Sequence, residues 1–133
     1  MSRALRVGNV LAIALALGVA GWFARRSPTD QTIHYVLGNE ASRVEELVAR
    51  WDDDPSADGP RDWVREAKYR YQPGTAPRII THEPRLRNGD YLVELEVALA
   101  GPQPSRAVLH KHIHLTGGVT SIDVGSSVGR SGD

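Results

Sequence analysis

The strongest constraint on the fold is an alternation of apolar and polar residues that recurs along the chain. In "DYLVELEVAL", the odd-numbered residues from Tyr91 to Leu99 are apolar, while Glu94 and Glu96 fall on the other face. The stretches "TIHYVL", "DWVREAKYRY" and "SIDV" alternate in the same way. This period of two is typical of half-buried antiparallel strands.

Turn-forming stretches separate these strands. "DPSADGP", "QPGTAP", "RNGD" and "AGPQPS" are rich in Gly, Pro, Asn and Asp, which favour tight turns. About seven short strands joined in this way predict an all-β fold, an antiparallel two-sheet sandwich. We expect the β-sandwich domain over residues 32–124, preceded by a linker at 27–31 and followed by a disordered tail at 125–133.

One stretch is ambiguous. In "SRVEELVARW" the apolar residues fit helical spacing, and Ser42 with Glu45 resembles a capping box. Leu47, Ala49 and Trp51 also alternate. We predict a strand from about Glu46 to Asp53, with a helical turn near Ser42 as the alternative.

The sequence of residues 1–26 predicts that the N-terminus is a membrane-directing segment. Residues 7–24 carry no charge, and eighteen helical residues span about 27 Å, close to the roughly 30 Å of a bilayer core. Arg25 and Arg26 end the apolar run and favour an uncleaved single-pass signal anchor, a transmembrane helix. The alternative is a cleaved signal peptide, since Gly18 and Ala20 supply small residues for cleavage.

The arginines also bear on location. Those at the very N-terminus favour an anchor in the inner (cytoplasmic) membrane with the domain exported, whereas Arg25 and Arg26 favour the reverse. We expect the exported, periplasmic or extracytoplasmic orientation. From Ser27 onward 12 basic residues face 16 acidic ones, a formal net charge of −4, which argues against nucleic-acid binding. The chain has no cysteine, so disulfides and thiolate metal sites are excluded.

The stretch "LRNGDYLVELEVAL … HIHLTGGVTSIDV", Leu86 to Val124, resembles the last three strands of transthyretin-like sandwiches, such as carboxypeptidase regulatory-like and PEGA-type domains. The resemblance rests on a strand that follows a turn as Gly-x-Tyr and on a closing strand after a Gly-rich turn. It implies a non-catalytic accessory module of the cell envelope, and it supplies no functional residues.

The stretch "VLHKHIHL" carries the candidate site. Leu109, Ile113 and Leu115 are apolar, so His110, His112 and His114 point outward. Lys111 then faces inward, as expected of a protected edge strand. We expect this strand to pair with "DYLVELEVAL", with Glu96 opposite His110 and Glu94 opposite His112.

Two readings of this strand remain open. His110, His112, Glu94 and Glu96 form a candidate zinc or copper site, with Asp123 or water as a further ligand. His114 lies too far along the strand to join the same ion. Alternatively, the residues form an exposed face of Glu–His pairs. His34 and His82 are isolated and are interpreted as structural or surface residues.

Two other motifs match functional patterns only in part. "GSSVG", Gly125 to Gly129, matches a nucleophile elbow by letter, but no histidine follows it. "WDDDPSADG" lacks the spacing of a calcium loop, so a solvated turn is favoured. We therefore expect no enzyme and no cofactor. The sequence favours a membrane-anchored interaction module with an unidentified envelope protein as partner, and a metal-binding module is the alternative.

Overall fold

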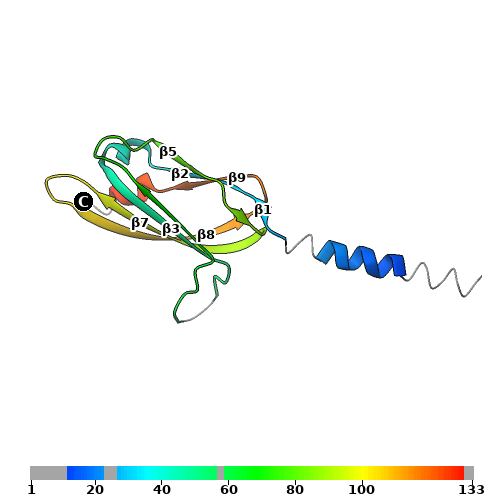
Figure 1. The fold of residues 1–133 in the computed structure, drawn as a ribbon. Coiled ribbons are helices and arrows are strands. Elements are labelled where there is room, and N and C mark those ends of the chain that lie inside the picture. The colour runs from blue at the N-terminus through cyan, green and yellow to red at the C-terminus, as the bar shows by residue number, and fades with distance from the viewer. Residues whose placement is uncertain (1–11, 23–26, 57–58, 131–133) are drawn as a thin grey trace, which may run out of the picture.

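The chain folds mostly into β-strands (Figure 1). A computed structural model describes residues 12–22, 27–56 and 59–130. The strands are β1 (Thr29–Asp30), β2 (Thr32–Val36), β3 (Val44–Asp52), β4 (Arg65–Arg70), β5 (Ile79–His82), β6 (Arg85–Leu86), β7 (Gly89–Leu99), β8 (Ser105–Leu115) and β9 (Val119–Asp123). A 3-10 helix, η1 (Gly38–Arg43), follows β2, and a short helix, α2 (Gly125–Arg130), follows β9.

The strands form three sheets. The largest has the order β4-β3-β7-β8 and is antiparallel throughout. A second has the order β5-β2-β9, and a two-stranded sheet joins β1 to β6. One pairing departs from the predicted antiparallel pattern, because β9 runs parallel to β2. The chain leaves β8 through the turn at Thr116–Gly118 and enters the other sheet alongside β2, where the backbone N–H of Thr32 donates to the Gly118 carbonyl at 3.2 Å.

The two larger sheets contribute to one hydrophobic core. The apolar face predicted for residues 91–99 is buried as expected, and Trp51 of β3 and Tyr35 of β2 are fully buried beside it. The core residues are Ile33, Tyr35, Leu37, Ala41, Val44, Leu47, Ala49, Trp51, Ile80, Leu86, Tyr91, Val93, Leu95, Val97, Leu99, Leu115, Ile122, Val124 and Val128. Alternation in sequence therefore identified which face of β3, β4 and β7 turns inward.

The ambiguous stretch resolves as a strand with a short helix before it. β3 runs over Val44–Asp52, as the alternation predicted, and starts two residues earlier than expected. The 3-10 helix η1 includes Ser42 and ends at Arg43, so a helical turn does lie near Ser42, but Glu45 and the apolar residues with helical spacing belong to β3.

Two segments predicted to be unstructured belong to the β domain. Within the predicted linker, Thr29 and Asp30 form β1, and Gln31 is almost completely buried. The Gln31 side chain donates to the Leu86 carbonyl and accepts from the backbone N–H of Gly117. Tertiary hydrogen bonds thus order a segment with no hydrophobic period of its own.

The predicted tail is also partly ordered. Residues 125–130 form α2, and Val128 is buried in the core. Asp123 accepts hydrogen bonds from the backbone N–H and the hydroxyl of Ser126, an arrangement that favours a helix start. Residues 131–133 lie outside the described part of the chain.

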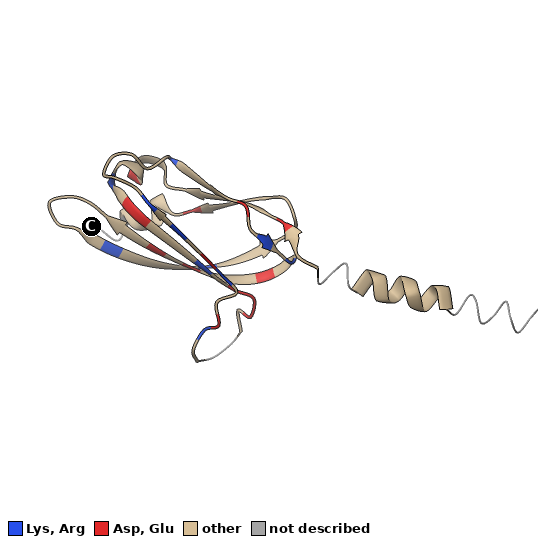
Figure 2. Cartoon of the chain, in the orientation of Figure 1, with Lys and Arg blue, Asp and Glu red and all other residues tan. Residues whose placement is uncertain are grey.

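The predicted membrane segment is only partly described. Residues 12–22 are helical and carry no charge, and in Figure 2 this helix stands apart from the charged strands. Among the described residues, no helix has both the length and the apolar character needed to cross a membrane. Residues 7–11 and 23–24 of the predicted span fall outside the described ranges.

Candidate functional site

The outer face of the four-stranded sheet carries most of the residues that the sequence singled out. Residues directly opposite each other on paired strands share a face, so the strand register identifies its members. We call this surface the polar face. Its charged and imidazole side chains are Glu46, Arg50, Asp52, Glu66, Lys68, Arg70, Asp90, Glu94, Glu96, Arg106, His110, His112 and His114.

The register between β7 and β8 differs from the predicted one by two residues. Glu94 lies opposite His110, Leu92 lies opposite His112, and Glu96 lies opposite Val108. The predicted pairs Glu96–His110 and Glu94–His112 are therefore wrong. The strands remain paired up to Leu99 and Ser105, so the connecting loop has only five residues, whereas the predicted register needed seven.

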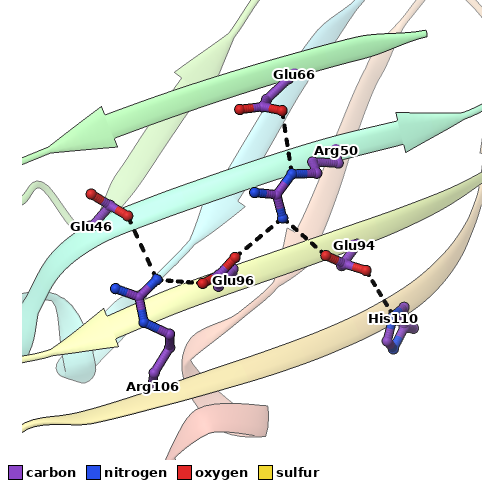
Figure 3. A network of polar contacts seen from close by, with 7 residues as sticks. All are labelled: Glu46, Arg50, Glu66, Glu94, Glu96, Arg106 and His110. Atoms are coloured by element: carbon purple, nitrogen blue, oxygen red, sulfur yellow. Dashed lines mark hydrogen bonds and ion pairs between the residues drawn. The ribbon is translucent and has the colours of Figure 1, made fainter. Parts of the chain in front are cut away.

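Arg50 is the centre of an ion-pair network on this face (Figure 3). Its guanidinium lies 3.3 Å from the carboxylate of Glu66 on β4, 3.0 Å from that of Glu94 and 3.2 Å from that of Glu96 on β7. Glu96 also pairs with Arg106 on β8. The network thus crosses all four strands of the sheet.

The network changes the ionisation of its central groups. The hydrogen bond from Arg106, followed by that from Arg50, lowers the pKa of Glu96. The contact with Glu96 raises the pKa of Arg50, and Glu66 and Glu94 act in the same direction. Because the folded pKa of Glu96 is lowered, its stabilising contribution is present at neutral pH and is lost as the pH falls through the acidic range.

The histidines of β8 have unequal surroundings. The His110 ring lies 3.3 Å from Glu94, and the His114 ring lies 2.8 Å from Asp90. His112 faces Leu92 and makes no ion pair with the described residues. Together with Pro55, Tyr91 and Ile113, the residues Asp90, His112 and His114 line a pocket of about 240 Å³.

The predicted metal ligands are separated by this arrangement. Glu94 contacts both His110 and Arg50, whereas Glu96 is occupied by Arg50 and Arg106. Within residues 12–22, 27–56 and 59–130, no three His, Asp or Glu residues are grouped so that they could hold a metal ion. The metal site remains a prediction from the sequence.

Sequence reasoning missed the two arginines that organise the polar face. Arg50 sits in the alternating stretch "LVARW", at a polar position between Ala49 and Trp51. That alternation was the available signal, because it places Arg50 on the same side as the glutamates once the strands pair. Arg106 lies at the start of β8, and only the true register reveals its contact with Glu96.

The acidic turn after β3 is held by the domain itself. Asp52 is buried, and its carboxylate accepts from the backbone N–H of Asp54 at 2.9 Å and pairs with Arg61 at 3.3 Å. Asp53 pairs with Arg87. These contacts give Asp52 and Asp53 a role in fixing the turn.

We expect Arg50→Gln to destabilise the fold by about 1 kcal/mol, because Glu66, Glu94 and Glu96 would then repel one another across a half-buried face. The loss should shrink in high salt, which screens charges at the surface. Urea unfolding at low and at high ionic strength measures it. The matched control is Arg70→Gln, because the Arg70 side chain is 73% exposed and makes one ion pair, with Glu46. Equal effects of the two variants, or no dependence on salt, would contradict the network.

In comparisons with known proteins, no family model, no curated protein and no solved structure matches this chain. The resemblance of Leu86 to Val124 to transthyretin-like domains therefore remains an expectation from the sequence. What the chain does has to be argued from its own residues.

Proposed function

We propose that this chain is a membrane-anchored, non-catalytic envelope protein whose β-sandwich domain acts as an interaction module outside the cytoplasm. One observation carries the proposal. In the helix of residues 12–22, the large apolar side chains face outward: Ile13 is 60% exposed and Leu17 is 69% exposed. Large apolar side chains exposed together are typical of a surface that contacts a membrane or a partner, and the charge-free run over residues 7–24 has nearly the length of a bilayer core as a helix.

The polar face supports interaction in preference to catalysis. Most of its acids and bases lie on an open sheet, and Arg50, Glu94, Glu96 and Arg106 neutralise one another in ion pairs. Catalytic groups need a concave site that excludes water and shifts their pKa values toward the working pH. Instead, Glu96 has a lowered pKa, which keeps it ionised and paired at neutral pH.

The membrane anchor is tested by vesicle flotation. The full chain, mixed with phosphatidylcholine vesicles and washed with high salt, should float with the lipid. The variant Leu15→Glu/Leu17→Glu should stay at the bottom of the gradient, because a charge at the centre of an apolar span costs roughly 2.5–3.5 kcal/mol per residue.

The matched control is Val119→Glu, which places the same charge on an exposed residue of the β domain. It should float like the unaltered chain. If the unaltered chain does not float, or if the Leu15→Glu/Leu17→Glu variant floats as well as it does, membrane anchoring through this segment is wrong.

A further inference from the structure

The free edge of β8 is the longest unpaired backbone surface in the described domain. β8 is the last strand of the four-stranded sheet and pairs with β7 along all eleven of its residues without a shift in register. On its other side, no strand from residues 27–56 or 59–130 pairs with it. An edge strand of this kind exposes backbone N–H and C=O groups that another strand can bind.

The other edges are shorter or better protected. β4, at the opposite side of the same sheet, has six residues, four of them charged. β5 has four residues and β9 has five. β8 has only two charged residues, Arg106 and Lys111, and the amine of Lys111 turns inward to the Ser127 hydroxyl at 3.2 Å. β8 is therefore the longest of these edges, and because Lys111 turns inward, Arg106 is the only Lys, Arg, Asp or Glu residue on its outward face.

The two faces of β8 differ in chemistry. Outward, the strand presents Arg106, the exposed Val108 and three histidines, with no acidic residue of its own. The His110 and His114 side chains are 56% and 65% exposed, so each keeps a ring nitrogen available beyond its contact with β7. Inward, Ala107, Leu109 and Ile113 pack against the core but are only half-buried.

We propose that β8 binds an extended segment of a partner protein in which acidic and apolar residues alternate. The segment adds as a fifth strand to the sheet, with backbone hydrogen bonds along the β8 edge. Its carboxylates face Arg106, His110, His112 and His114, and its apolar side chains cover Ala107, Leu109 and Ile113. The inference rests on the proposed function, because it names the surface and the partner class of the same interaction module.

The charges of β8 argue against a second copy of this chain as the occupant. Two β8 strands paired around a two-fold axis would place Arg106 and the histidines of one copy beside those of the other. Neither copy would then supply a carboxylate to pair with Arg106 or to accept from the imidazole N–H groups of the other copy. An acidic segment has the complementary sign, so it fits this edge better than β8 itself does.

The probe is a ten-residue peptide that alternates Glu and Val, added to the full chain in detergent micelles. The readout is hydrogen exchange of backbone amides by NMR. Amides of β8 should become protected, whereas those of β4 should not. A peptide with Lys in place of Glu should bind much more weakly, because its lysines repel Arg106 and cannot accept hydrogen bonds from the imidazole N–H groups.

Two substitutions, each of which introduces a glutamate, test where the peptide binds. His112→Glu should weaken peptide binding about fivefold, a loss of roughly 1 kcal/mol. His112 is exposed and makes no ion pair with the described residues, so the substitution leaves the fold intact. Lys68→Glu on β4 is the matched control on the opposite edge of the same sheet and should leave binding unchanged.

The proposal is overturned if the acidic peptide protects no β8 amides, if the Lys peptide binds as well, or if both substitutions weaken binding equally. The flotation experiment is independent of these results. If the chain floats with vesicles but does not bind the peptide, the membrane anchor is supported and the β8 surface is wrong. If the chain binds the peptide but does not float, the β8 surface is supported and the membrane anchor is wrong.

Discussion

The Gly125→Ala variant is expected to lose at least about 3 kcal/mol of folding free energy, because a methyl group there collides with backbone. A Cβ atom at Gly125 would lie 2.1 Å from the carbonyl oxygen of Leu37 and 2.8 Å from its carbonyl carbon. A flexible side chain can move aside, but the backbone at Leu37 is held. Leu37 is buried, and its N–H donates to the Arg78 carbonyl at 2.8 Å.

The close approach at Gly125 follows from the parallel pairing of β2 and β9. The ladder runs from Thr32 opposite Val119 to Val36 opposite Asp123, and the N–H of Val124 then donates to the Val36 carbonyl at 3.0 Å. The next residue must pass directly beside Leu37 as α2 begins. Only a residue without a side chain fits there.

Gly129→Ala is the matched control because it lies in the same short helix. The nearest atom to its added methyl would be a Glu40 carboxylate oxygen at 3.5 Å, an ordinary contact. Alanine also favours helix over glycine by up to about 1 kcal/mol, so this variant should be as stable as the unaltered chain or more so. Urea unfolding followed by tryptophan fluorescence measures both. Similar losses in the two variants would show that α2 as a whole, and not the contact with Leu37, sets the effect.

Alternation in the sequence predicted the strands well because each strand is half-buried. The faces of β4 and β7 and the inward position of Lys111 on β8 follow from a period of two. Gln31 and Val128 escaped prediction for the opposite reason. Each lies in a short polar segment and is buried by contacts from residues distant in sequence. Asp123 was a local signal for the start of α2, because aspartate favours that position and here accepts from Ser126. The small residues of "GSSVG", two of them glycines, suggested a tail instead.

The glutamates and histidines of the polar face were predicted, but their pairing and the two central arginines were not. The alternation correctly predicted that Glu94, Glu96 and the histidines face outward. Which of them meet depends on register, and register depends on the length of one loop. A shift of two residues keeps every side chain on its face and changes every partner. This is why the contacts of Glu96 proved to be with Arg50 and Arg106 instead of His110.

Tyr35→Phe should destabilise the domain by about 1–3 kcal/mol, because it removes the only hydroxyl in a buried polar chain. The indole N–H of Trp51 donates to the Tyr35 oxygen at 3.1 Å, and that oxygen lies 3.0 Å from Nδ1 of His82. Trp51 and Tyr35 are both fully buried. Without the hydroxyl, the Trp51 N–H loses its acceptor in a place that water does not reach.

Tyr69→Phe is the matched control, since it deletes the same atom from a neighbouring ring whose centroid lies 6.4 Å from that of Tyr35. The Tyr69 hydroxyl makes no hydrogen bond with the described residues, so its loss should change stability by less than about 0.5 kcal/mol. Equal losses from Tyr35→Phe and Tyr69→Phe would mean that ring packing, and not the hydrogen-bonded chain, decides the effect.

The hydrogen bonds that link Trp51, Tyr35 and His82 also make the stability of the domain depend on pH, which can be checked independently. Because the Tyr35 hydroxyl accepts from Trp51, its own proton goes to Nδ1 of His82, which must then be unprotonated. Burial, and next the positive charge of Arg65, lower the pKa of His82. A histidine with a lowered folded pKa binds fewer protons than in the unfolded chain, so stability is full above about pH 6.5 and falls as the pH drops below it.

The variant His82→Asn separates the titration of His82 from its role as a hydrogen-bond acceptor. The amide oxygen of asparagine can accept from Tyr35, but the side chain does not titrate. Its midpoint of thermal unfolding should therefore depend less on pH between 7 and 5 than that of the unaltered chain. An unchanged slope would assign the pH dependence to a group other than His82.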